Sequence, residues 1–202
     1  MRLTIPLLIV VFACAALGDT VTLQPDGALS NDTHTSQEHP DTPTDDLFLC
    51  VAAPGYADGA HCMFIEFTEL DAYMGATVNE AKLCIFAEHV MSPGTLQIGP
   101  CDAAWDEATL TWNTMPGVHA SYQFEYVTIY RWQEIDVTGF VQNMLDGVYE
   151  NHGFCLFDNG GVDEMLSTQS GETDDADYRP KLELDYTPSA VEPASWGTIK
   201  TL

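Results

Sequence analysis

Basic side chains are the scarcest chemical feature of this sequence. Its 202 residues contain 6 Lys and Arg against 31 Asp and Glu, which gives a formal net charge of −25 at pH 7. Such a surface repels the phosphates of nucleic acids, so the composition excludes a typical nucleic-acid-binding protein. It also disfavours docking on anionic lipid. The acidic surface favours solubility and is compatible with divalent cations.

Long apolar runs are missing beyond the N-terminus. The stretch 3–16 is almost wholly apolar and follows Arg2, but a membrane span needs about 20 such residues. Ala16 and Gly18 place small residues at positions −3 and −1 of a cleavage site before Asp19. We therefore predict a signal peptide over residues 1–18, a secreted protein and no transmembrane segment. Residues 11–14 loosely resemble a lipobox, so a lipid anchor on Cys14 is the alternative.

Sequence motifs for catalysis and for zinc are also missing. There is no Gly-x-Ser-x-Gly nucleophile elbow and no Cys-x-x-Cys pair, and the six histidines show no ligand spacing. Carboxylates are abundant, but no pattern marks a catalytic pair. The sequence therefore predicts a protein that is not an enzyme.

The cysteines favour an oxidising compartment. Apart from Cys14 there are five, which are disulfide candidates in an exported protein. Cys50 and Cys62 flank a turn-rich stretch and are expected to face each other across a hairpin. Cys84 and Cys101 are candidates for a second bridge, which would leave Cys155 alone. The sequence does not fix this connectivity.

Short apolar or alternating runs separated by turn residues are typical of an all-β protein. The long polar stretch 27–46 reads as a loop with room for a short edge strand. In 81–86, alternation places Ala81, Leu83 and Ile85 on one face. The predicted strands are 20–23, 47–52, 62–67, 81–86, 95–98, 122–130, 153–157 and 182–186.

One segment, 136–147, has a helical pattern. Its apolar residues at 137, 140, 141, 144 and 145 share one helical face. Asp136 is placed to cap the first turn, and Gly147 suits the position after the last. Many short strands with one short helix predict an all-β fold, a two-sheet antiparallel jelly-roll-like sandwich over residues 19–188. Residues 189–202 read as a linker and a short C-terminal tail, whose role is sorting, docking on a partner or docking on the sheet of this chain.

Six motifs stand out along the sequence, in this order: 75–83 (GATVNEAKL), 105–113 (WDEATLTWN) with Pro116, 132–138 (WQEIDVT), 153–154 (GF), 170–172 (SGE) and 179–182 (RPKL). Taken together, they are similar to the DNRLRE-domain family of secreted jelly-roll modules related to carbohydrate-binding modules. The resemblance implies an extracellular module, with polysaccharide or a cell-surface component as its partner. The family's usual Arg near Cys62 is absent here. Without the leader, only Lys82, Arg131, Arg179, Lys181 and Lys200 are basic, which disfavours an anionic glycan unless cations bridge it.

Aromatic side chains are the candidate ligand contacts, because their faces pack against sugar C–H groups. Tyr122, Tyr126 and Tyr130 are spaced to lie on one face of a strand, either as an exposed platform or as core. Trp105, and Tyr56 at a hairpin tip, are further candidates. Trp112 shares a face with Leu110, which indicates a structural role.

Charged residues provide two further expectations. Arg179, in an acidic neighbourhood, is expected to form a structural ion pair with Glu107. Asp158, Asp163 and Glu164 in one loop, and Asp174 in another (172–177), are candidate ligands for structural calcium, which prefers several oxygen ligands. The sequence thus predicts a carbohydrate-binding module, with a structural or assembly protein of the cell surface or extracellular matrix as the alternative.

Overall fold

The computed structural model describes residues 18–24, 31–44, 47–90, 94–126, 130–158, 160 and 165–189. The expected signal peptide up to residue 17, Cys14, the loop residues Asp163 and Glu164, and the C-terminal tail after Ser189 lie outside these residues. Within them, no helix is long and apolar enough to cross a membrane.

The described chain is built almost entirely of β-strands, with one α-helix and two short 3-10 helices. The strands are β1 (Asp19–Leu23), β2 (Asn31–Ser36), β3 (Phe48–Ala52), β4 (His61–Glu66), β5 (Thr77–Val90), β6 (Gly94–Pro100), β7 (Tyr122–Tyr126), β8 (Arg131–Asp136), β9 (Phe154–Phe157), β10 (Met165–Gln169) and β11 (Lys181–Thr187). The helices are η1 (Thr68–Tyr73), α1 (Thr138–Leu145) and η2 (Ala176–Tyr178).

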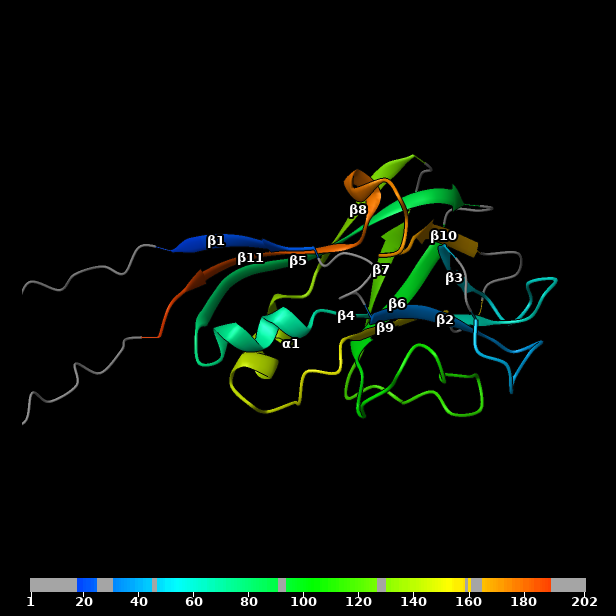
Figure 1. Ribbon diagram of the computed structural model, residues 1–202, viewed down its shortest axis with the longest axis horizontal. Coiled ribbons are helices and arrows are strands. Elements are labelled where there is room, and N and C mark those ends of the chain that lie inside the picture. The colour runs from blue at the N-terminus through cyan, green and yellow to red at the C-terminus, as the bar shows by residue number, and fades with distance from the viewer. Residues whose placement is uncertain are drawn as a thin grey trace, which may run out of the picture.

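The strands form one antiparallel sheet that curls into a half-barrel (Figure 1). Its order is β1-β11-β5-β10-β3-β4-β9-β6-β7, with β2 also paired to β4 and β8 to β5. The prediction of two separate sheets is therefore replaced by a single sheet. The physical reason is the β3–β4 hairpin, in which Ala52 pairs with His61. This pair joins the strands up to β3 in the order above to the strands from β4 onward, so the sheet is continuous.

The core lies on the inner side of this curl. The predicted alternation in β5 is confirmed, since Ala81, Leu83 and Ile85 are all fully buried. Burying a side chain such as Leu83 contributes roughly 1.5–3 kcal/mol. A second, smaller cluster gathers around Phe64, Leu110 and Cys155. Residues at even positions of β5, from Lys82 to Glu88, therefore face away from the main core.

The predicted helix is also confirmed. Val141, Met144 and Leu145 of α1 are buried, and the helix packs against β5 (Figure 1). The Asp136 carboxylate accepts a hydrogen bond from the Thr138 amide at 2.9 Å, and this bonding lowers the pKa of Asp136. Gly147 follows the helix at φ 70°, a conformation that glycine adopts without strain.

The cysteine pairs expected from the sequence are not brought together. Cys50 lies opposite Ser167 in β10, whereas Cys62 lies opposite Thr35 in β2. Cys84 is in the middle of β5, and Cys101 belongs to the second core cluster. All five cysteines among the described residues are free thiols. The strand register, which the sequence does not reveal, decides these neighbours.

Candidate functional site

Three strands bring an unusual set of side chains to the outer face of the sheet. In the middle of this face, β5 lies between β8 and β11. Phe86 of β5 is paired with Trp132 of β8. Two residues earlier, Cys84 is paired with Glu134 on one side and Lys181 on the other. Residues that are far apart in the sequence therefore meet on one surface.

Phe86, Trp132 and Tyr178 form an aromatic cluster on this outer face. The Phe86 and Trp132 ring centroids are 5.7 Å apart at 73°, and those of Phe86 and Tyr178 are 4.4 Å apart at 41°. Tyr178 is 39% exposed, while the other two are half-buried. Each ring is thus held by its neighbour and still reaches solvent.

The segment before β11 fixes the position of Tyr178. The last residues of this segment form η2. There the Asp175 carboxylate accepts a hydrogen bond from the Asp177 amide at 3.2 Å. The Arg179 guanidinium donates to the Thr173 carbonyl at 2.9 and 3.1 Å. Arg179 therefore ties down this loop through a backbone carbonyl, and its ion pair with Glu107 stays a prediction from the sequence.

Two lysines border the aromatic cluster and are surrounded by glutamates. The Lys181 ammonium lies 4.8 Å from the Trp132 ring centroid, a cation–π distance. The same ammonium is 2.8 Å from the Glu183 carboxylate. Lys82 contacts the carboxylates of Glu80 at 3.3 Å and Glu134 at 3.7 Å. Hydrogen bonding to these glutamates raises the pKa of both lysines, so both are charged at neutral pH.

A shallow groove continues the same face toward the N-terminal strand. Glu183, the partner of Lys181, is part of its lining, so the groove and the aromatic cluster are contiguous. Its volume is about 280 Å³. The lining residues are Thr20, Val21, Thr22, Glu80, Lys82, Glu183, Leu184 and Asp185.

This arrangement suits a ligand with both apolar and hydroxyl-bearing surfaces. The aromatic rings offer faces and edges for C–H groups. The lysine ammoniums donate hydrogen bonds, the carboxylates accept them and the threonine hydroxyls do both. From Lys82 to Phe86 the strand advances about 13 Å, so the face is long enough to contact more than one ring of a chain molecule.

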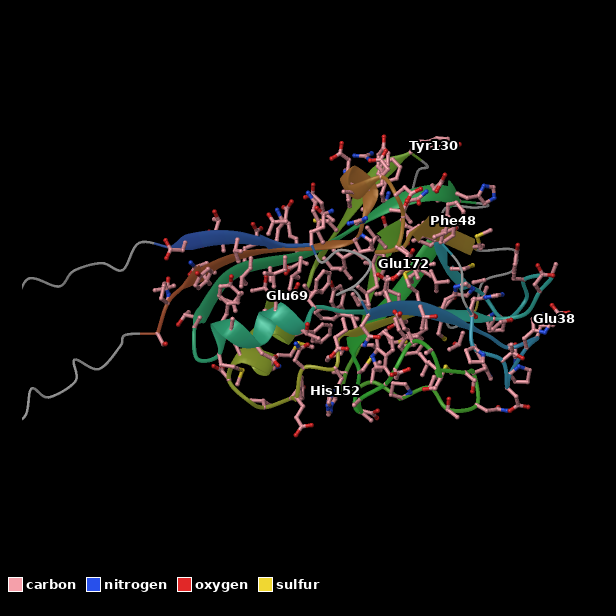
Figure 2. The ribbon with its side chains drawn as sticks, viewed as in Figure 1. Glu38, Phe48, Glu69, Tyr130, His152 and Glu172 are labelled. Carbon is pink, nitrogen blue, oxygen red and sulfur yellow. The ribbon has the colours of Figure 1, made fainter. Side chains whose placement is uncertain are left out.

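The three tyrosines predicted to share a strand face do not form a platform. Tyr126 is fully buried. Tyr122 is half-buried, with its ring 5.6 Å from Phe140 and its hydroxyl donating to the Asp136 carbonyl. Tyr130 is 70% exposed but lies outside β7, at the edge of the molecule where β8 begins (Figure 2). Tyr122, Tyr126 and Tyr130 therefore do not share an exposed strand face.

The predicted tryptophans and Tyr56 lie apart from the outer face. The Trp105 indole N–H donates to the His152 carbonyl at 2.8 Å, and its ring is 5.6 Å from Phe64. Trp112 packs on the second core cluster with Met115. Tyr56 is in the β3–β4 turn, with its ring centroid 6.3 Å from that of His61 in an edge-to-face arrangement. Trp105 and Trp112 thus have packing partners in the structure.

Three carboxyl groups converge on a pocket of about 380 Å³ elsewhere in the molecule, lined in part by Asp32, Glu107 and Glu172. Asp32 accepts a hydrogen bond from the Gly171 amide at 2.9 Å, and its own amide donates to Glu107 at 3.2 Å. Burial, followed by the negative charge of Glu172, raises the pKa of Asp32 to about 8. Asp32 is therefore predominantly protonated at pH 7.

The candidate calcium loops do not form a metal centre within the described residues. No group of three or more His, Cys, Asp or Glu side chains in that part of the chain is placed to hold a metal ion. Asp158 accepts a hydrogen bond from the Gly160 amide at 2.8 Å, and Asp174 is exposed. Calcium binding stays a prediction from the sequence.

Comparison with known protein families gives a match over most of the chain. The model of carbohydrate-binding module family 96 matches residues 28–186, which include the aromatic cluster and both lysines that border it. No curated protein matches the chain.

Proposed function

Because the chain belongs to carbohydrate-binding module family 96, whose members are non-catalytic binding modules, we propose that it binds polysaccharide through the outer face of β5, β8 and β11. The observation that supports this assignment is the aromatic cluster, which is continuous with a polar groove. A carbohydrate-binding surface needs apolar faces for the ring carbons and hydrogen-bonding groups for the hydroxyls. This face offers both within one contiguous surface.

The charges on the face favour a neutral polysaccharide. Lys82 and Lys181 are its cations, and both are engaged by carboxylates at 2.8–3.7 Å. Glu80, Glu134, Glu183 and Asp185 outnumber them on the same surface. Close approach of an anionic glycan would bring like charges together, which costs free energy. Hydroxyl groups can accept from the lysines and donate to the carboxylates without that cost.

The proposal places the protein outside the cell. The leader-like stretch 1–18 supports export, and the order of motifs shared with DNRLRE-domain modules supports a closer relationship to those extracellular proteins. The same resemblance supports a jelly-roll-like arrangement of the two halves of the sheet. The acidic composition is also consistent with an exported, highly soluble module.

Affinity gel electrophoresis with a panel of soluble glycans tests this function. Xylan, galactomannan and mixed-linkage β-glucan are the neutral probes, and alginate and pectate are the anionic ones. Each is run with calcium and with chelator. We expect at least one neutral glycan to retard the protein equally in both conditions, because the proposed contacts need no metal.

The other outcomes are equally informative. Retardation by an anionic glycan only, and only with calcium, would replace the neutral ligand by a cation-bridged one. Retardation by no glycan in either condition would contradict the binding function and favour the structural or assembly role.

A further inference from the structure

Three buried thiols lie together on the second half of the sheet. Cys155 of β9 is paired with Phe64 of β4 and with Gly99 of β6. Cys62 lies two residues before Phe64, and Cys101 lies two residues after Gly99. Both cysteines are therefore diagonal neighbours of Cys155. Side chains two residues apart on a strand point to the same face. The three thiols therefore share one face and belong to the same core cluster.

Cys155 interacts more strongly with Cys62 than with Cys101. Hydrogen bonding with the Cys62 thiol is the largest cause that raises the pKa of Cys155, ahead of burial and of the charge effect of Cys101. Cys155 also donates to the Leu156 carbonyl, with a sulfur–oxygen distance of 3.9 Å. Cys62 and Cys155 therefore interact within the core, and a bond between their sulfur atoms would join β4 directly to β9.

An apolar pocket opens onto these same two thiols. It has a volume of about 410 Å³, and its lining includes Cys62 and Cys155 together with Trp112, Met115 and Phe157. Cys101 is fully buried and does not belong to the lining formed by the described residues. A small reagent that enters the pocket therefore meets Cys62 and Cys155 first.

We propose that Cys62 and Cys155 form a disulfide that crosslinks β4 and β9. The oxidant is a small-molecule disulfide, such as oxidised glutathione, that enters through the apolar pocket. The Cys62 thiolate attacks one sulfur of this molecule and releases one glutathione thiolate, which takes up a proton. The Cys155 thiol then gives up its proton, its sulfur attacks the Cys62 sulfur of the mixed disulfide, and the second glutathione leaves as a thiolate that takes up a proton. Two protein thiols are oxidised, and one disulfide is reduced to two thiols.

This bond differs from every pair expected from the sequence. It joins residues 62 and 155, so it closes a loop of about 90 residues in the unfolded chain, and crosslinks that close long loops stabilise most in the chain-entropy model. We expect the oxidised protein to have a Tm about 10 °C above that of the reduced protein.

Peptide mapping of the full-length protein tests the proposal. The protein is incubated with oxidised glutathione, both in the native state and during refolding from the reduced, denatured state, then alkylated and digested without reductant. We expect a peptide pair that links Cys62 to Cys155, while Cys101, Cys84 and Cys50 carry the alkyl label. Cys84→Ser, the matched control, should keep the link and the Tm difference between oxidised and reduced protein. Cys62→Ala should lose both.

Three results would overturn the proposal, and all can be seen with the unmutated protein. They are a link from Cys155 to Cys101, a stable glutathione adduct on either thiol, and complete alkylation of all cysteines after both treatments. Peptide mapping of the unmutated protein therefore tests the Cys62–Cys155 disulfide even if a cysteine variant does not fold.

Discussion

Trp132→Ala should weaken binding of the neutral glycan by about 30-fold, the size of effect seen when a central aromatic contact is removed. Trp132 is the centre of the proposed surface, because it contacts Phe86 on one side and the Lys181 ammonium on the other. Alanine removes the stacking area and releases the lysine from its position. Affinity gel electrophoresis against a range of glycan concentrations measures the change in Kd.

Variants of the surrounding residues make this result specific. Trp132→Phe keeps an aromatic face and should retain part of the affinity, whereas Tyr178→Ala should reduce it by about 10-fold. Tyr56→Ala is the matched control, since Tyr56 is an aromatic residue in the β3–β4 turn, away from the outer face. Wild-type affinity in Trp132→Ala together with loss of binding in Tyr56→Ala would place the binding surface at the hairpin instead.

Asp32→Asn should stabilise the protein more at pH 8 than at pH 5, with a difference of about 3 kcal/mol between the two pH values. The pKa of Asp32 is raised from 3.8 to about 8 by burial and by the carboxylates of Glu172 and Glu107. The folded state therefore binds a proton that the unfolded state releases above about pH 4. As pH rises from 4 to 8, folding stability falls, by up to about 1.4 kcal/mol per pH unit.

Asparagine resembles the protonated carboxyl group at every pH. Its side-chain oxygen can still accept from the Gly171 amide, and its amide nitrogen can donate to Glu172. The fall in folding stability between pH 4 and pH 8 should therefore disappear in Asp32→Asn. Urea unfolding at pH 5 and pH 8 in the presence of chelator measures the difference. Asp174→Asn, an exposed position in the neighbouring loop, should shift stability equally at both pH values. A variant no more stable than wild type at pH 8 would show that Asp32 titrates normally.

Regular hydrophobic patterns were sufficient to predict much of this fold. The alternation in 81–86 identified the core face of β5, and the helical spacing in 136–147 identified α1 together with the Asp136 carboxylate that accepts from the amide of its first residue. These predictions depend only on periodicity and on local hydrogen bonding. Both involve residues that are close together in the sequence, so they can be recognised without knowledge of the fold.

Strand β2, in the stretch where the sequence left room for a short edge strand, shows why the position and burial of an element can escape prediction. Its sequence, NDTHTS, is polar and reads as loop, yet Thr33, His34 and Thr35 are all buried. Pairing with β4 satisfies the backbone, and the Thr33 hydroxyl donates to the Thr44 carbonyl at 3.2 Å. Burial also lowers the pKa of His34 to about 4, so that it is neutral in the interior. Tertiary hydrogen bonds overrode the hydrophobic pattern here, and no local rule predicts them.

The binding surface was missed for a related reason. Phe86, Trp132 and Tyr178 are each about 46 residues from the next, and only the registers of β5 with β8 and β11 bring them together. The regular spacing of Tyr122, Tyr126 and Tyr130 within one segment pointed to these residues instead. The sequence did contain one usable signal. Since the odd positions of β5 are core, Lys82 and Phe86 had to face the other way.

The most direct test of the account maps the glycan-binding surface by NMR. The ¹⁵N-labelled protein is titrated with an oligosaccharide hydrolysate of the neutral glycan that the electrophoresis panel selects. The account predicts that amide shift changes gather at residues 82–86 in β5, 132–134 in β8 and 178–183 around β11, together with the Trp132 indole signal. Changes that gather at the apolar pocket beside Trp112, while those three segments stay unperturbed, would contradict it.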